Sequence, residues 1–545
     1  MSDIKLIGWY RESFLSNKDL PAFSDYEGVE YSYAEAAKLI YQIHGFFEKA
    51  GLRKGDKVAL LGRNSSHWGI SFLATISYGA VAVPVLPDFN PADVHHIVRH
   101  SGSKLLFAGD LLVQKLDLAE MPDLEAVVSL QRMEGIWAKT TELLNYWRMH
   151  HSNRPVYTDE LLMPGELADD DICVISYTSG TSGFTKGVML PVKSLKSNIR
   201  FARQYMPLKQ GEKIVSFLPM AHVFGLLFEF LFPISLGCHI TFLTKAPTPQ
   251  IIVKAFKEIR PHLILSVPLV IEKIYQKQIQ PALEKPVMCF LLKVPGIRNL
   301  LYKKIREKLV ETFGGRFYEI VIGGAALNRE VEDFFRKIGF RFTIGYGMTE
   351  CGPLISYQAW NKTRPYSAGS LVDRMELRID SADPYCEVGE ILVRGENVMA
   401  GYYKNPEATE QAIDADGWLN TGDLGITDAD NFIYIRGRSK NMLLGPSGQN
   451  IYPEEIEAKL SAQHFVLECV VVDRKGKLVA LVFPDHESLK IHKNDNTPDI
   501  ERIMEEYRQK VNKELAKYSQ VSAIELVETE FEKTPKRNIK RYLYR

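Results

Sequence analysis

The stretch YTSGTSGFTKGV, Tyr177–Val188, decides how the fold of this sequence is predicted. It follows DICVIS, Asp171–Ser176, an apolar run with the length of a buried strand. The glycines let backbone N–H groups curl around an anion, the hydroxyls add uncharged donors, and Lys186 adds a positive charge. The spacing differs from a Walker A loop, because Lys186 is followed by Gly187 rather than Ser or Thr. We predict a phosphate cradle; a flexible surface loop rich in Ser and Gly is the alternative.

Strands and helices alternate on both sides of this stretch. The apolar patterns predict helices at Tyr33–Ala50 and Trp68–Tyr78, and strands at Lys57–Leu61, Ala80–Val85, Pro261–Val267 and Tyr318–Ile322. This alternation predicts an α/β fold with largely parallel sheets. Short, turn-rich strands over about residues 365–437 indicate a β-rich subdomain. A compact α+β unit follows, so we predict an N-terminal domain over residues 1–437 and a small mobile C-terminal domain over 438–545.

The composition excludes several classes of protein. Of the 545 residues, 67 are Lys or Arg and 67 are Asp or Glu, so the chain lacks the basic bias of a nucleic-acid binder. The six cysteines form no C-x-x-C or Cys/His cluster, which argues against structural zinc and suits a reducing cytosol. The first residues show no secretory h-region. The apolar stretch Val223–Leu243 is interrupted by Glu229, Pro233 and His239, which favours a core helix and strand over a membrane span. We expect a cytoplasmic protein.

Further motifs follow the glycine-rich stretch in a fixed order. They are LPMAHVFG from Leu218, GGAAL from Gly323, GYGMTE from Gly345, GWLNTGDLG from Gly417 and YIRGRSKNMLLGPSGQNIYPEEIE from Tyr434. With these motifs the chain resembles the adenylate-forming, AMP-binding enzymes, which include acyl-CoA synthetases, luciferases and peptide-synthetase adenylation domains. Their loop is T-S-G-T-T-G-x-P-K-G, from which this chain departs at Ser182 and Thr185. The resemblance is closest to long-chain fatty acyl-CoA synthetases.

The resemblance implies a nucleotide site. Tyr346 would pack on adenine, Thr349 would bind the α-phosphate, and Glu350 would hold Mg²⁺. Asp423 would bind the ribose hydroxyls, and Arg438 the ribose or phosphate. The other implied nucleotide contacts are Thr178, Ser179, Gly180, Thr181, Ser182, Gly183, Lys186, Gly324, Ala325, Gly347 and Met348, with Thr181 a second metal ligand. In isolation, GYGMTE would favour a strand end with a capping Thr and a surface Glu, and the alternative for Asp423 is an Asp-Gly-type turn.

The resemblance also assigns residues to the acyl and thiol steps. His222 would sit beside the acyl pocket and move aside for the thiol, although alone it would indicate a core histidine. Lys440 would be the hinge about which the C-terminal domain rotates. Gly448 would let its loop approach the pantetheine of coenzyme A.

The basic stretch TPKRNIKRYLYR, Thr534–Arg545, breaks the family pattern at one position. The family ends in a motif like P-K-T-x-x-G-K-I-x-R, whose lysine before Ile serves adenylation. Here that place holds Asn538. Lys536 and Lys540 lie two residues to either side, and in an extended segment both share a face with Asn538. We assign the missing charge to Lys536, with Lys540 as the alternative.

The resemblance implies an AMP-forming fatty acid:CoA ligase that uses ATP, Mg²⁺ and coenzyme A. The alternatives are an acyl-AMP ligase that transfers to a carrier protein and a non-catalytic adenylate-binding homologue. The basic stretch from Lys293 to Leu309 favours a solvated helix face, with peripheral contact to an anionic membrane as the alternative. We expect no nucleic-acid partner, and the sequence does not distinguish a monomer from a homodimer.

Overall fold

The two strands that flank the glycine-rich loop, β8 and β9, lie near one edge of an eight-stranded sheet with the strand order β20-β9-β8-β4-β3-β5-β6-β7. The computed structural model describes residues 5–150, 167–179, 185–283, 285–444, 449–474, 476–486, 489, 499–534 and 539–544. The strands are β3 (Lys57–Leu61), β4 (Val81–Val85), β5 (Ser103–Ala108), β6 (Ala126–Ser129), β7 (Gly135–Ala138), β8 (Ile172–Ser179), β9 (Thr185–Pro191) and β20 (Gly401–Tyr402). The pairs β8–β4, β4–β3, β3–β5 and β5–β6 are parallel, as predicted.

Helices cover both faces of this sheet, which explains why consecutive apolar residues occur in its central strands. Val58 and Leu60 point into a core shared with α2 (Tyr33–Lys49) and α3 (Ser66–Tyr78). Ala59 and Leu61 point the other way, into a core shared with α4 (Pro91–Ser101). Three further helices of this part are α1 (Leu6–Ser16), α5 (Asp110–Val113) and α6 (Thr141–His150).

The strands on either side of the glycine-rich loop form an antiparallel pair. Ser179 at the end of β8 lies opposite Thr185 at the start of β9. The loop is therefore followed by a strand, and the positive end of a helix dipole does not lie directly after it. A phosphate cradle here would depend on loop amides, hydroxyls and Lys186. The loop residues 180–184 lie outside the described part of the chain.

Two further sheets complete the body of the N-terminal domain. One has the order β10-β11-β1-β2, and the other has the parallel order β12-β13-β14. Their strands are β1 (Pro21–Asp25), β2 (Glu30–Ser32), β10 (Lys213–Ser216), β11 (His239–Phe242), β12 (Leu263–Ser266), β13 (Glu319–Ile322) and β14 (Phe342–Ile344). The helices are α7 (Val192–Tyr205), α8 (Val223–Gly225), α9 (Phe232–Leu236), α10 (Pro249–Ile259), α11 (Pro268–Ile274), α12 (Gln280–Leu283), α13 (Pro286–Leu291), α14 (Pro295–Thr312) and α15 (Arg329–Ile338).

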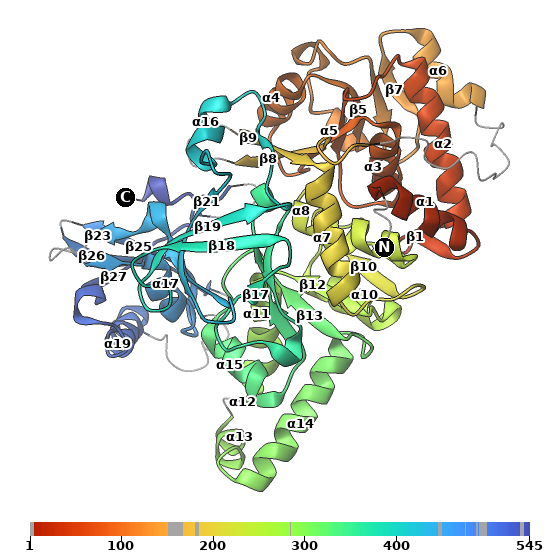
Figure 1. The fold of residues 1–545 in the computed structure, drawn as a ribbon. Coiled ribbons are helices and arrows are strands. Elements are labelled where there is room, and N and C mark those ends of the chain that lie inside the picture. Colours follow the sequence, from red (N-terminus) through yellow and green to blue (C-terminus); the bar gives the residue numbers. More distant parts are fainter. Residues whose placement is uncertain are drawn as a thin grey trace.

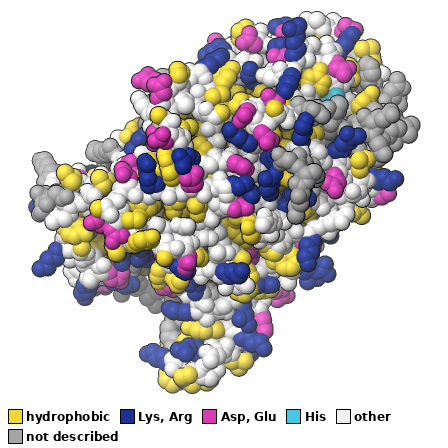
Figure 2. All heavy atoms as spheres, in the orientation of Figure 1, with side chains coloured by type: hydrophobic (Ala, Val, Ile, Leu, Met, Phe, Trp, Pro, Cys, Tyr) yellow, Lys and Arg dark blue, Asp and Glu magenta, His cyan; other side chains and the backbone are white. Residues whose placement is uncertain are grey.

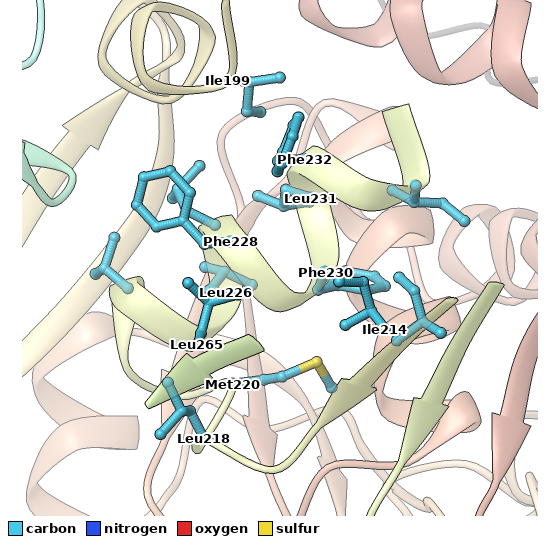
Figure 3. Packing of buried hydrophobic residues seen from close by; sticks show 14 of the residues in the cluster. Ile199, Ile214, Leu218, Met220, Leu226, Phe228, Phe230, Leu231, Phe232 and Leu265 are labelled. Carbon is cyan, nitrogen blue, oxygen red and sulfur yellow. The ribbon is translucent and has the colours of Figure 1, made fainter. Parts of the chain in front are cut away.

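The long apolar stretch after His222 is part of the core. It forms α8, a π-helical segment over Leu226–Leu231, α9 and β11. Figure 3 shows side chains of the π-helical segment, such as Leu226 and Phe230, among core residues that include Ile214 and Leu265. In the part of the chain that the structure describes, no helix is long and apolar enough to cross a membrane. The predicted core helix and strand are confirmed.

The β-rich strands and the small C-terminal domain follow. Small antiparallel sheets contain β15 (Tyr346–Gly347), β16 (Leu354–Tyr357) and β17 (Ser370–Leu371), and then β18 (Met375–Asp380), β19 (Gly389–Gly395), β21 (Leu419–Thr427) and β22 (Ile433–Arg438). Helix α16 spans Pro406–Ala412. The C-terminal domain contains β23 (Leu443–Leu444), β24 (Asn450–Ile451), α17 (Pro453–Ser461), β25 (Val466–Arg474), β26 (Lys477–Pro484), α19 (Ile500–Asn512) and β27 (Ala523–Leu526). The large and small domains lie side by side in Figure 1.

The charged pattern of residues 500–517 is typical of a single helix over that range, but α19 is shorter. It ends at Asn512, whose side-chain amide donates to the carbonyl of Val521 at 2.9 Å and accepts from the Val521 N–H at 2.8 Å. These two bonds fold the chain back toward β27. A tertiary contact therefore ends the helix before its sequence pattern does.

Candidate active site

A cleft of about 2820 Å³ is lined by residues from both domains. It brings together the described residues that sequence analysis assigned to the site: Thr178, Lys186, His222, Gly324, Ala325, Tyr346, Gly347, Met348, Thr349, Glu350, Asp423, Arg438 and Lys440. The predicted site residues Gly180–Gly183, Gly448, Lys536 and Asn538 lie outside the described residues, as does the side chain of Ser179. Residues far apart in the sequence thus share one cleft.

Asp423 is held at the cleft by two side chains. The Tyr346 hydroxyl donates to Asp423 Oδ2 at 2.7 Å, and Arg438 Nε lies 3.0 Å from Oδ1. Strand pairing accounts for the ion pair, because Asp423 on β21 lies directly opposite Arg438 on β22. Burial raises the pKa of Asp423, while the Arg438 charge and the Tyr346 hydrogen bond oppose that rise. The carboxylate is thus oriented in advance, as a binder of ligand hydroxyls requires.

Glu350 is joined to the glycine-rich hairpin through Tyr402. The Tyr402 hydroxyl donates to Glu350 Oε1 at 2.9 Å, and Lys186 Nζ lies 4.7 Å from the centre of the Tyr402 ring. Strand β20 positions Tyr402, because it pairs with β9 two residues beyond Lys186. Burial, followed by the Glu350 carboxylate, raises the pKa of Tyr402, so its hydroxyl stays a donor. Tyr402 was not among the site residues predicted above, although the sequence GYYKN places it after Gly401, a turn signal, and next to a second tyrosine.

His222 follows a segment that buried polar groups fix in place. Glu229 Oε2 accepts from the backbone N–H groups of Phe217 and Leu218 at 3.0 and 2.9 Å, and Asn64 Oδ1 accepts from Met220 N–H at 2.9 Å. Glu229 is fully buried, and burial raises the pKa of its carboxyl well above the usual range. Sequence analysis treated Glu229 only as an interruption of an apolar stretch. Its contacts show that it positions the backbone leading to His222.

The segment around Lys440 is attached to both domains. Ser439 Oγ donates to Glu390 Oε1 on β19 at 2.6 Å, and the other oxygen of Glu390 accepts from Asn420 at 2.6 Å. On the other side of Lys440, Asn441 Nδ2 donates to Glu454 Oε1 on α17 at 2.6 Å. The residues flanking Lys440 therefore bind carboxylates on opposite sides of it.

The basic tail reaches the same cleft. Arg541 pairs through both terminal nitrogens with the buried Glu457 on α17, with one N–O distance of 2.7 Å. Lys540 Nζ lies 3.3 Å from Glu532, and a β-bridge joins Lys533 to Ile539. Thr534 and the residues from Ile539 to Tyr542 line the cleft. The tail is therefore anchored to the C-terminal domain and faces the predicted site.

The donors present suit a magnesium ion that arrives with a nucleotide. The described residues contain no group of three or more His, Cys, Asp or Glu side chains that could hold a metal ion by themselves. Among the carboxylates that line the cleft, that of Glu350 is the one next to Thr349 in the chain. Mg²⁺ commonly takes one or two protein carboxylates and completes its shell with phosphate and water oxygens. Glu350 thus fits the role that sequence analysis gave it.

The same cleft also contains an apolar region. It consists of Phe224, Phe228, Val267, Tyr275, Leu283, Leu292, Tyr302 and Phe334, which we call the apolar part of the cleft. The aromatic rings of Phe224 and Phe228 lie 5.9 Å apart, and those of Tyr275 and Phe334 lie 5.3 Å apart. Gly323 leaves room for Phe224, because a Cβ there would come within 3.2 Å of its ring. This region suits the hydrocarbon portion of a ligand.

Comparison with known proteins identifies the family. The AMP-binding enzyme family matches residues 11–403, and the AMP-binding enzyme C-terminal domain matches residues 455–538. The chain belongs to the AMP-binding enzymes, within the adenylate-forming acid–CoA ligases, which use ATP and coenzyme A. The resemblance seen in the sequence is confirmed.

The relatives act on different acids. Long-chain-fatty-acid–CoA ligase FadD15 of Mycobacterium bovis (strain ATCC BAA-935 / AF2122/97) is 29% identical over 494 residues, 85% of this chain and 79% of that protein. 4-Coumarate–CoA ligase 1 of Arabidopsis thaliana is 28% identical over 471 residues, 82% and 77% of the two chains. The crystal structure of the anthranilate CoA ligase AuaEII in complex with anthranoyl-AMP superposes with a TM-score of 0.81 at 20% identity, covering 99% of this chain and 96% of that one. The last likeness supports the fold alone.

Proposed function

We propose that this protein is an AMP-forming fatty acid:CoA ligase. It would activate a fatty acid with ATP to acyl-AMP and pyrophosphate and then transfer the acyl group to coenzyme A. One observation carries the proposal: the polar residues Asp423 and Glu350 and the residues of the apolar part of the cleft line one continuous cleft. The likeness to FadD15 supports a fatty acid as the substrate.

In the first half-reaction, a carboxylate oxygen attacks the α-phosphorus of ATP and pyrophosphate leaves. Both reactants are anionic, so their repulsion must be screened. Lys186, Thr349 and the loop from Thr178 to Gly183 would bind the phosphates, and Asp423, Tyr346 and Arg438 the nucleoside. The turn at Gly324 and Ala325, with Gly347 and Met348, would line the nucleotide. Glu350, with Thr181 as a second ligand, would hold Mg²⁺, which supplies charge screening when bound.

In the second half-reaction, the coenzyme A thiol attacks the acyl-AMP carbonyl and AMP leaves. His222 would move aside for the thiol, and the loop containing Gly448 would approach the pantetheine. We place the hinge at Lys440 and the domain boundary at 437/438. Ser439 is bonded to Glu390 of the large domain, and Asn441 to Glu454 of the C-terminal domain. These contacts support a hinge at Lys440, because the domains could rotate through changes in the few backbone angles between the two bonded residues.

We assign the adenylation lysine to Lys536, with Asn538 in the usual lysine position. The anchoring of Arg541 to Glu457 supports this role, since it holds the tail beside the cleft. Lys540 is the weaker candidate because its ammonium group already lies 3.3 Å from Glu532.

The decisive experiment measures both half-reactions with purified protein. ATP, Mg²⁺ and palmitate should give pyrophosphate, and coenzyme A should then give palmitoyl-CoA. Acyl transfer to a carrier protein without acyl-CoA formation would identify the carrier-protein ligase instead. Pyrophosphate release with 4-coumarate but not with palmitate would overturn the fatty-acid assignment. No release across a range of acid chain lengths would favour a non-catalytic adenylate-binding homologue.

A further inference from the structure

Helices α13 and α14 form an arm that projects from the body of the protein (Figure 1). Among the residues of α14, Pro295–Thr312, only Leu309 and Thr312 are buried, and both lie at its attached end. Residues 293–300 are all exposed. Side chains at the far end of the arm therefore contribute little to the packing of the core.

The free end of the arm carries large apolar side chains. Val287 is 71% exposed and Phe290 is 68% exposed. They belong to a group of five exposed apolar residues, which we call the arm tip: Val287, Phe290, Val294, Ile297 and Leu300. Figure 2 shows apolar and basic side chains together on this arm. A grouped apolar patch of this kind marks a contact surface rather than ordinary solvent-exposed surface.

The charges around the arm tip select the kind of partner. From Lys285 to Lys308 the sequence has seven Lys or Arg residues and a single acidic residue, Glu307. Within the tip itself, Lys285, Lys293 and Arg298 lie among the apolar residues with no acidic side chain between them in the sequence. Protein interfaces are depleted in lysine, whereas apolar residues ringed by cations match an anionic lipid surface.

Residues of the arm, and one just before it, line the cleft. Leu283 and Leu292 lie on either side of α13, Tyr302 lies on α14, and all three belong to the apolar part of the cleft. The Tyr302 ring lies 6.5 Å from that of Phe334 on α15. The same arm therefore carries an exposed apolar tip and contributes to the region proposed to hold the acyl chain.

We infer that the arm tip docks onto an anionic lipid bilayer and brings the apolar part of the cleft to the membrane surface. Val287 and Phe290 enter the boundary between headgroups and acyl chains, and Lys293 and Arg298 face the anionic headgroups. A fatty acid dissolved in the bilayer then enters beside Leu283 and Leu292. The delivery of the acid rests on the proposed function, but the docking itself does not.

The test is co-sedimentation of the full-length protein with vesicles. Vesicles of mixed phosphatidylcholine and phosphatidylglycerol should bind the protein, and vesicles of phosphatidylcholine alone should bind it far less. The double variant Val287→Asp/Phe290→Asp should bind at least about tenfold more weakly. The double variant Lys293→Glu/Arg298→Glu should also bind these vesicles at least about tenfold more weakly. A higher salt concentration should weaken the binding of the wild-type protein to them. The control is Leu111→Asp on α5, where Leu111 is 74% exposed, and it should bind as the wild type does.

Several results would overturn the inference. The inference would be wrong if the wild-type protein did not bind anionic vesicles, or if the tip variants bound them as well as the wild type does. It would also be wrong if the tip variants changed their oligomeric state without any change in vesicle binding. Pyrophosphate release with octanoate in the absence of vesicles should be unchanged in the tip variants. If a tip variant loses vesicle binding but releases pyrophosphate at the normal rate, the proposed function stands. Vesicle binding without release with any acid would refute the proposed function and leave the docking intact.

Discussion

The hydroxyl of Tyr402 donates a 2.9 Å hydrogen bond to Glu350, while Lys186 lies over the Tyr402 ring. One aromatic side chain thus connects the proposed metal-binding carboxylate to the lysine of the glycine-rich hairpin. In Tyr402→Phe the ring remains beneath Lys186 and only the hydrogen bond to Glu350 is lost. Loss of a bond to a charged group costs about 1.5–3 kcal/mol. We expect kcat/KM for ATP in pyrophosphate release to fall at least about tenfold.

The matched control for this prediction is Tyr403→Phe. The Tyr403 hydroxyl makes a 3.4 Å contact with the Ser101 carbonyl and does not bind Glu350. This variant should keep kcat/KM within about twofold of the wild type, because a long bond of this kind contributes little. An equal loss in both variants would mean that the effect of Tyr402→Phe comes from packing rather than from Glu350.

Asp423 and Tyr346 allow a double-mutant cycle on nucleotide binding. Asp423→Asn removes the charge that pairs with Arg438 and weakens acceptance of ribose hydroxyls, so the Kd for ATP should rise about ten- to a hundredfold. Tyr346→Phe should have a smaller effect, because the ring that would pack on adenine remains. If the 2.7 Å bond orients Asp423, the double variant should lose less than the two single losses combined. Additive losses, measured by isothermal titration calorimetry, would contradict that orienting role.

Much of the fold could be predicted from the sequence because a strand that is buried on both faces appears as a short run of apolar residues. In KVALL every residue after Lys57 is apolar, because Val58 and Ala59 enter cores on opposite faces of one sheet. The site residues were assigned from the order of the family motifs, and their chemistry, such as the carboxylate of Asp423, suits the proposed roles. Tyr402 and Glu229 were missed because their roles depend on contacts with distant segments. Tyr402 meets Glu350 from 52 positions away, and no local pattern in the sequence indicates that contact.

Glu229 should make the free energy of unfolding depend on pH. Burial raises the pKa of its carboxyl in the folded state well above the unfolded value. Its contribution to stability is therefore fully present below the unfolded pKa, about 4.3, and is lost as pH rises toward the folded pKa. Glu229→Gln keeps an oxygen for the amides of Phe217 and Leu218 and does not titrate. Urea unfolding should show the stability of the variant relative to wild type increasing from pH 5 to pH 8, by up to about 1.4 kcal/mol per pH unit. A difference that stays constant over this range would show that Glu229 ionises normally in the fold.

Lys536 and Lys540 can be separated by comparing the two half-reactions. If Lys536 supplies the positive charge for adenylation, Lys536→Ala should lower fatty-acid-dependent pyrophosphate release about ten- to a hundredfold. Thiol transfer from supplied acyl-AMP should change little, because that step needs no charge at the α-phosphate. Lys540→Ala is the matched control, since Lys540 already lies 3.3 Å from Glu532, and it should leave both rates within about threefold. A larger loss of pyrophosphate release in Lys540→Ala would move the assignment to Lys540. Equal losses of both half-reactions in Lys536→Ala would show that the tail supports the C-terminal domain rather than the adenylation step.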